Sequence, residues 1–176
     1  MKTFQLLVVV IPVLVLNGRA WATTVFRMDL ETLIQESDSI VQGEVERVAA
    51  EWDEQKRTIF TYVLLRVHDQ LKGNLSSTML IRQLGGKVGS TRLSIVGMPA
   101  FSKGAEVIVF LKRTPEQTHQ VVGLGQGKYD ITNDFAVADI SGIDLLDKRT
   151  SQIIEGGFLS RQPLANFKAQ IRRLVK

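Results

Sequence analysis

The chain has 176 residues, no cysteine and a formal net charge of +4 at pH 7. Without cysteine it has no disulfide, no thiol nucleophile and no thiolate metal site. Basic and acidic residues are interleaved along the chain with no basic stripe, so the composition argues against a nucleic-acid-binding protein.

The first residues carry the features of a signal peptide. Lys2 gives a positive start, Leu6–Leu16 is an apolar run of eleven residues, and Ala20–Ala22 has the small-x-small pattern of a signal-peptidase site. A run this short does not comfortably span a bilayer core of about 30 Å, which takes roughly 20 residues. We therefore predict cleavage near Ala22, a periplasmic or secreted bacterial location, and no transmembrane segment after signal removal.

Removing these 22 residues leaves Thr23–Lys176, which is 154 residues and enough for one domain with its own core. Lys2 and Arg19 leave with the signal, so 20 basic residues face 18 acidic ones and the net charge falls to +2. Nucleic-acid binding depends on phosphate contacts, so this near-neutral balance favours a protein or a glycan as the partner.

The mature chain opens with a short helix and a long hairpin. Apolar residues at helical spacing follow Asp29, a good N-cap residue, which predicts a helix over Asp29–Ser37. An alternating strand comes next, and its phase slips between Val45 and Val48, which predicts a β-bulge. The polar turn Asp53–Arg57 leads into the alternating stretch TIFTYVLLRVHDQLKG, so we expect these two strands to form a hairpin.

The middle of the chain contains two further strands separated by an excursion. Thr78–Leu84 predicts the third strand. Gly85–Gly104 is rich in glycine and contains Pro99, so we expect an irregular excursion without regular elements. Glu106–Arg113 is apolar on both faces through its middle, so we expect it to be the most buried strand.

The stretch VVGLGQGKYDI places Gly123, Gly125 and Gly127 at every second position, directly before Lys128. A phosphate-binding loop needs its glycines to close a strand and open a helix whose first amides hold the anion. Here a strand-like sequence follows, and the lysine is not followed by Ser or Thr. We therefore predict that the glycines strip one face of a strand, at a barrel corner or where another backbone approaches closely.

The C-terminal part completes the predicted fold. After the strand DFAVADI, Ser141–Gly157 predicts a loop, and apolar residues at helical spacing after Pro163 predict an amphipathic helix. We expect this helix to pack on the barrel; the alternative is a membrane-surface role for its basic residues, which are Lys168, Arg172, Arg173 and Lys176.

Five or more short strands, one of them bulged, with glycine-marked corners and a flanking helix predict an all-β fold. The expected architecture is a small closed or partly open β-barrel of the oligonucleotide/oligosaccharide-binding (OB) type, with a short N-terminal helix and a C-terminal amphipathic helix. A β-sandwich is the alternative. The expected divisions are a signal peptide (1–22), the barrel domain (23–140), and a C-terminal loop and helix on the barrel (141–176).

Two surfaces are candidates for ligand binding. One face of the second strand carries aromatic rings and cations that can stack bases or sugars, namely Phe60, Tyr62, Arg66 and His68. The other surface is the excursion over Gly85–Phe101, because loops on a rigid scaffold often carry function. Its candidate ligand-binding residues are Lys87, Arg92 and Phe101.

No recognisable catalytic or metal-binding motif is present. The two histidines, His68 and His119, form no HExxH motif, so a zinc site would depend on tertiary proximity alone. No serine lies in a GxSxG elbow, and acidic pairs such as Asp53 and Glu54 fall in predicted turns. We therefore predict no catalytic residue, no metal and no cofactor, although a carboxylate pair brought together only by the fold stays open.

The layout from SDSIVQGEVERV through TIFTYVLLRVHDQLKG to GMPAFSKGAEVIVFLKR and VVGLGQGKYDI resembles a group of uncharacterised exported bacterial proteins, over roughly Leu30–Ile131. The first half is also distantly similar to the netrin-like barrel of tissue inhibitors of metalloproteinases. This resemblance implies an OB-type barrel. It does not imply the same inhibitory chemistry, because in those inhibitors an N-terminal cysteine chelates the protease zinc, whereas the expected mature start here is Thr23.

These observations predict an exported, non-catalytic binding module whose ligand is a protein or a glycan. Two alternatives stay open, a hydrolase with a site assembled across strands and a module similar to a protease inhibitor. A concave pocket with at least two convergent titratable groups would favour the hydrolase.

Overall fold

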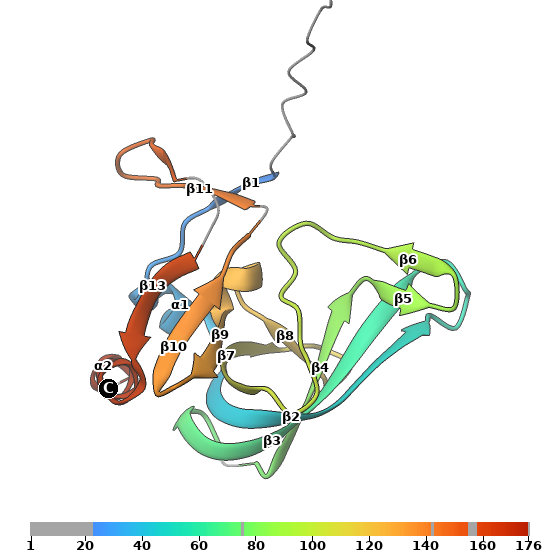
Figure 1. Ribbon diagram of the computed structural model, residues 1–176, viewed down its shortest axis with the longest axis horizontal. Helices are drawn as coiled ribbons and strands as arrows, with labels where there is room; N and C mark the ends of the chain where they lie inside the picture. The colour runs from blue at the N-terminus through green and yellow to red at the C-terminus, as the bar shows by residue number, and fades with distance from the viewer. Residues whose placement is uncertain (1–22, 75, 142, 155–157, 176) are drawn as a thin grey trace, which may run out of the picture.

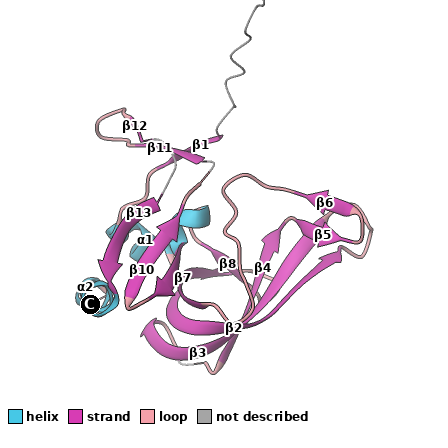
Figure 2. Cartoon of the chain, in the orientation of Figure 1, coloured by secondary structure: helices cyan, strands magenta, loops and turns pink. Residues whose placement is uncertain are grey.

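The computed structural model describes residues 23–74, 76–141, 143–154 and 158–175, so the predicted signal peptide lies outside the described residues (Figure 1). The helices are α1 (Leu30–Glu36), the single-turn 3-10 helix η1 (Leu124–Gly127) and α2 (Leu164–Leu174). The strands are β1 (Thr23–Phe26), β2 (Ser39–Trp52), β3 (Ile59–Lys72), β4 (Thr78–Leu84), β5 (Gly86–Val88), β6 (Thr91–Leu93), β7 (Glu106–Arg113), β8 (His119–Val121), β9 (Lys128–Thr132), β10 (Phe135–Asp139), β11 (Ile143–Leu146), β12 (Ile153–Ile154) and β13 (Phe158–Pro163). Strands dominate the molecule, and most of them belong to one sheet (Figure 2).

Five strands close into a barrel, which confirms the predicted small β-barrel. β2 pairs with both β3 and β7, and β3 pairs with β4, all antiparallel. β8 completes the ring, because it pairs in parallel with β4 and antiparallel with β7. The order around the barrel is therefore β2-β3-β4-β8-β7, closing on β2, and the sandwich alternative is wrong.

The long β2–β3 hairpin carries the predicted bulge. Val45 lies opposite Leu65 and Arg47 lies opposite Leu64, so Glu46 is the extra residue on β2. A bulge bends its strand and increases the local twist. The first part of β2 pairs with β7 in the barrel, from Ser39 to Glu44, while the part beyond the bulge pairs only with β3.

The sheet divides at β7. Along one edge, β7 pairs with β9 over Val107–Val109 and with β8 over Leu111–Arg113. β8 curls back to close the barrel, while β9 continues outward to β10 and β13. All five residues of Val107–Leu111 are fully buried, which confirms β7 as the most buried of the strands whose side chains the structure describes. One of its faces lines the barrel core with Val107, Val109 and Leu111, and the other supplies Ile108 and Phe110 to a second core.

Both helices cover the second core. Asp29 caps α1, because its side chain accepts the amide hydrogen of Thr32, as the sequence predicts. α2 buries Phe167 against Tyr129 and Phe110, with ring centroids 4.5 Å and 6.4 Å from that of Phe167. Hydrophobic burial and these tilted ring contacts hold the helix on the sheet.

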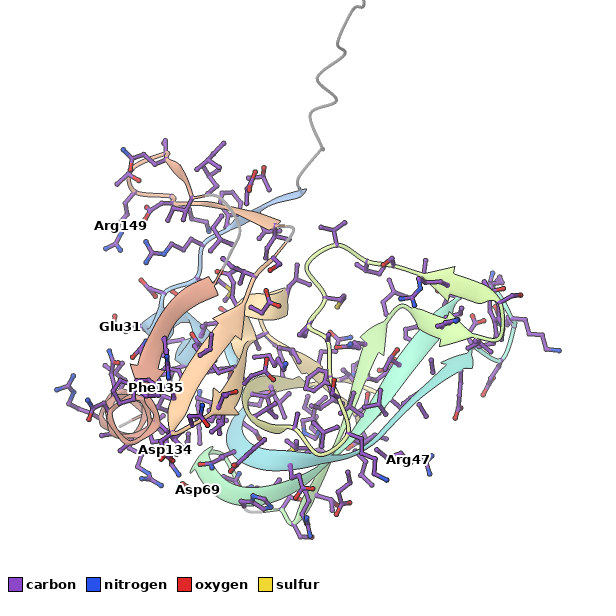
Figure 3. The ribbon with its side chains drawn as sticks, in the orientation of Figure 1. Glu31, Arg47, Asp69, Asp134, Phe135 and Arg149 are labelled. Carbon is purple, nitrogen blue, oxygen red and sulfur yellow. The ribbon has the colours of Figure 1, made fainter. Side chains whose placement is uncertain are left out.

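The basic face of α2 is partly engaged with the protein itself. Asp69 on β3 accepts both Lys168 and Arg172, at 2.6 Å and 2.7 Å, and it lies beside α2 in Figure 3. The predicted packing of α2 is confirmed, and two of the four basic residues considered for a membrane surface serve this docking instead. Among the described residues, no helix is long and apolar enough to cross a membrane.

Two segments that were expected to be irregular contain strands. Within the predicted loop Ser141–Gly157, β11 pairs in parallel with β1 and antiparallel with β12, so these three strands form a small separate sheet. Within the predicted excursion, β5 and β6 form a hairpin at the far end of β2 and β3 (Figure 1). In both cases the strands are too short for their alternation to be visible in the sequence.

The glycine-rich stretch is not a continuous strand, and that part of the prediction is wrong. β8 ends at Val121, η1 makes one tight turn, and β9 begins directly after Gly127. A Cβ on Gly127 would lie 2.0 Å from the carbonyl oxygen of Val122, so only glycine fits. The expected close backbone approach is therefore confirmed, and no helix follows the last glycine as a phosphate-binding loop requires.

η1 also explains why a glutamine stands among the glycines. The buried Gln126 side chain accepts the amide hydrogen of Met28 at 2.9 Å and donates to the carbonyl of Phe26 at 3.1 Å. This pair of hydrogen bonds fastens the segment before α1 to the point where β8 and β9 diverge. The glycine-rich stretch is thus a structural clamp at the barrel corner.

Candidate functional site

A groove of about 580 Å³ lies on the outer surface of the barrel. It is bounded by the β2–β3 turn on one side and by the β7–β8 turn on the other, and β3 and β4 contribute to it between them. We call it the outer groove. Its lining residues are Glu51, Trp52, Asp53, Glu54, Gln55, Arg57, Tyr62, Arg82, Glu116 and Thr118.

The strands in the outer groove place an arginine beside an aromatic pair. Tyr62 on β3 lies directly opposite Arg82 on β4, and both point outward because Val63 and Ile81 point into the barrel core. The Arg82 guanidinium stacks on the Phe60 ring, 3.6 Å from its centroid. This stacking fixes the direction of the arginine without consuming its hydrogen-bond donors.

One donor of Arg82 is left without a partner. Within the described part of the chain, its buried Nε makes no hydrogen bond. Buried polar groups in proteins are nearly always paired, and an unpaired one costs free energy. Because the Nε atom is shielded from solvent, a ligand can approach Arg82 only through the rest of the guanidinium group, which lines the outer groove.

The walls of the outer groove are preformed turns. The Asp53 carboxylate accepts the amide hydrogens of Arg57 and Thr58, at 2.6 Å and 3.1 Å, and so fixes the β2–β3 turn. In the β7–β8 turn the hydroxyls of Thr114 and Thr118 lie 2.9 Å apart, and Thr114 also bonds the Thr118 carbonyl. Binding in such a groove loses little entropy, because these walls are already ordered.

The outer groove is more acidic than basic. Four carboxylates stand against two guanidinium groups. Hydrogen bonds from its own amide and from Thr114, together with the positive charge of Arg82, lower the pKa of Glu116 below its ordinary value. The excess of negative charge repels polyanions, so the outer groove suits a neutral or basic ligand. The four carboxylates are those of Glu51, Asp53, Glu54 and Glu116.

The structure divides the candidate residues of the second strand into two groups. Tyr62 lines the outer groove. Phe60 does not line it, but its ring stacks on the guanidinium of Arg82, which does. Arg66 and His68 lie farther along β3 and face charged neighbours of their own. Arg66 binds Glu44 at 2.6 Å, and the Nδ1 atom of His68 lies 3.8 Å from the carboxylate of Glu106.

The candidates in the excursion do not join the outer groove. Lys87 and Arg92 lie opposite each other on the β5–β6 hairpin, and both are exposed. Phe101 is half-buried against the barrel core, and the Nζ of Lys128 lies 5.3 Å from its ring centroid. Their role in ligand binding stays a prediction.

Sequence reasoning missed Arg82, Trp52 and Glu116. Arg82 could have been found only from the register that sets it opposite Tyr62, and Glu116 only from closure of the barrel. The two histidines have different neighbours. The Nδ1 atom of His119 lies 3.3 Å from the Leu80 carbonyl oxygen, whereas that of His68 lies beside the Glu106 carboxylate. Among the residues that the structure describes, no three His, Asp or Glu side chains are grouped to hold a metal ion.

A larger groove of about 670 Å³ lies between α1, the end of β7 and the β11–β12 turn. Its charged side chains mostly satisfy one another, since Lys112 pairs with Glu36 at 3.3 Å and Arg27 with Asp147 at 3.5 Å. Size alone does not make a site, and the outer groove presents the stacked guanidinium of Arg82 beside Tyr62. We therefore take the outer groove as the candidate site.

No protein-family model matches the chain, and no curated protein matches it either. The functional assignment consequently rests on the geometry of the outer groove and on the predicted export of the chain.

Proposed function

We propose that this protein is an exported, non-catalytic binding module of the periplasm or extracellular space that holds a polypeptide segment of a partner in the outer groove. The observation that carries the proposal is the Arg82 guanidinium, which stacks on Phe60 and lines a groove between two ordered turns. A peptide carbonyl is the most common acceptor that a protein partner can offer to such a donor.

The surroundings of the outer groove favour a polypeptide over a glycan. Its acidic rim suits lysine or arginine side chains, and large apolar side chains are exposed nearby: Trp52 at 39%, Leu80 at 40% and Leu84 at 37%. Leu84 lies opposite Phe60, so apolar surface continues from the Arg82 stack. Basic and apolar side chains on one partner segment would match both features.

The barrel topology supports the same surface. In OB folds the ligand lies on the second and third strands and against the turns that join strands one to two and four to five. With β2 as the first barrel strand, these are β3, β4 and the two turns that bound the outer groove. We propose that the barrel is of this type. A netrin-like relationship and a protease as the partner are finer proposals.

The hydrolase alternative has less support in the outer groove. The Asp53 carboxylate is occupied by two amide hydrogens of its own turn, and Glu116 is exposed on the opposite turn with a lowered pKa. General acid catalysis by a carboxyl group requires a raised pKa. These environments favour binding over proton transfer.

The test is selection of random displayed peptides against the mature chain, with Trp52 fluorescence as the readout. Trp52 is the single tryptophan after the predicted cleavage and lines the outer groove, so occupancy should change its emission. We expect the selected peptides to be rich in basic and apolar residues. Tyr62→Ala and Arg82→Met should weaken them by about tenfold or more, while the control Arg66→Met, outside the outer groove, should not.

Absence of any enriched peptide, or equal binding by the Arg82→Met and Arg66→Met variants, would refute the proposal. A parallel screen on immobilised glycans identifies the competing ligand class, and turnover in a broad hydrolase screen would favour the enzyme instead.

A further inference from the structure

A second, smaller pocket opens where the sheet divides, beside the excursion that precedes β7. Its volume is about 260 Å³, and we call it the split pocket. The loop from Gly97 to Ala105 forms one wall, and β9 and the end of β10 form the other. The lining residues are Gly97, Met98, Pro99, Ala100, Ser102, Ala105, Lys128, Asp130, Asp139 and Ser141.

The split pocket contains an ion pair between a buried lysine and a half-exposed carboxylate. Lys128 is only 7% exposed, and its Nζ lies 2.6 Å from both carboxylate oxygens of Asp130. Removing a lysine from water is costly, and apolar residues of similar volume are often equally good for stability. Lys128 nevertheless lines the split pocket, so its ammonium group and the Asp130 carboxylate form part of the polar wall that a ligand meets.

A second carboxylate completes the polar side of the split pocket. Asp139 accepts hydrogen bonds from the Ser141 hydroxyl at 2.5 Å and from the Ser141 amide at 2.9 Å. These two bonds, and the positive charge of Lys128, lower the pKa of Asp139 against the opposing effect of burial. Asp139 is thus ionised at neutral pH, and the pocket presents one ammonium and two carboxylates.

The other side of the split pocket is apolar. Met98, Pro99, Ala100 and Ala105 contribute to the wall formed by the loop. Hydrogen bonds anchor the loop to the rest of the protein at both ends. The Gly125 amide donates to the Gly97 carbonyl at 2.9 Å, Gln83 donates to the Pro99 carbonyl at 2.9 Å, and the Gly104 amide donates to the Val45 carbonyl at 2.8 Å. The split pocket is therefore held open by fixed walls.

We propose that the split pocket binds one sugar ring. The hydroxyl groups of a sugar both donate and accept hydrogen bonds, which matches two carboxylates beside an ammonium group, and its C–H face matches the apolar wall. An anion is disfavoured, because the two carboxylates outnumber the one ammonium group. Pockets for larger ligands typically exceed about 300 Å³, so a single ring fits this smaller one.

This inference goes beyond the proposed function, because the split pocket shares no residue with the outer groove. A sugar site here can exist whether or not the outer groove holds a peptide, and failure of one leaves the other standing.

Saturation-transfer NMR on the mature chain with single sugars tests the inference. The probes are the methyl glycosides of glucose, galactose, mannose and N-acetylglucosamine, together with the corresponding free sugars. We expect transfer to at least one of them. Asp139→Asn, at an exposed position, should weaken that binding by about tenfold, because a charged hydrogen-bond acceptor is lost.

Two tryptophan substitutions in the excursion before β7 separate occupancy of the split pocket from a general disturbance of the excursion. Ala100→Trp fills the split pocket and should abolish transfer, whereas Ser94→Trp, exposed and outside the lining, should preserve it. Equal loss in both variants, unchanged binding in both, or no transfer to any probe would overturn the inference. Binding of methyl glycosides indicates the end of a glycan chain, and binding of free sugars alone indicates a free monosaccharide.

Discussion

Replacing Gly127 by alanine tests whether the glycine-rich stretch is structural. The new Cβ would lie 2.0 Å from the Val122 carbonyl oxygen, far inside ordinary contact distance. Val122 cannot move freely, because its amide donates to the Phe110 carbonyl at 2.9 Å in the core of the sheet. The turn must therefore open, which also loosens the Gln126 clamp on the segment before α1.

The cost of Gly127→Ala follows from these contacts. Overpacking at a rigid site costs about 1–3 kcal/mol, and each weakened hydrogen bond adds about 1 kcal/mol. With the two hydrogen bonds of Gln126, we expect a loss of about 3–5 kcal/mol in the free energy of unfolding. For a domain of this size that corresponds to a fall in Tm of about 10 °C.

Gly89→Ala is the matched control. Gly89 has φ +58° and no atom within 4 Å of an added Cβ, so only the left-handed backbone is strained. That strain costs about 1–2 kcal/mol. Urea unfolding followed by far-UV circular dichroism measures both variants. Equal stability of Gly127→Ala and the parent chain would refute the structural explanation, as would a nucleotide-induced rise in Tm that Gly127→Ala abolishes.

Three further predictions concern the second core. Phe167→Ala should cost about 3–5 kcal/mol in urea unfolding, because the ring is fully buried. Phe167→Leu should retain most of this stability. A loss below about 1 kcal/mol in Phe167→Ala would contradict the docking of α2. Burial opposes a low pKa at Asp69, but Lys168 and Arg172 outweigh it and lower the pKa. The stabilisation from Asp69 is thus present above its ordinary pKa and is lost as the pH falls through the folded value. Asp69→Asn should therefore cost about 1 kcal/mol at pH 7 and progressively less as the pH falls below the ordinary pKa of an aspartate. Burial raises the pKa of Tyr129 to about 12. About 2–3 kcal/mol of stability present below pH 10 should therefore disappear as the pH rises towards 12. A Tyr129→Phe chain that loses the same stability in alkali would exclude this cause.

The sequence predicts elements whose patterns are long and locally complete. The unbroken apolar middle of β7 indicates a strand covered on both faces, and the structure explains it by two cores that meet across that strand. The bulge near Glu46 and the Asp29 cap are equally local. These features depend on side-chain periodicity and capping, which the chain shows directly.

What the sequence misses depends on partners that are distant along the chain. β11 is a strand because β1 supplies its parallel neighbour, and nothing within Ile143–Leu146 signals that pairing. Alternation identifies Tyr62 as outward-facing, but its neighbour Arg82 follows only from the β3–β4 register. Register is set by turn geometry and by the core together, so composition and spacing do not reveal it.

The split pocket shows the same limit in another form. The lysine after the glycine run is visible in the sequence, but its burial against Asp130 and beside Phe101 depends on the loop that folds over β9. Its surroundings become apparent only once the sheet divides at β7.

Hydrogen–deuterium exchange of the mature chain with a selected peptide tests the central claim most directly. We predict slower exchange in β4, in the adjoining half of β3, and in the two turns at Asp53–Thr58 and Thr114–Thr118, with no change in the Arg82→Met variant. Protection confined to β9, β10 and α2, or protection that persists in Arg82→Met, would show that the outer groove is not where this protein binds its partner.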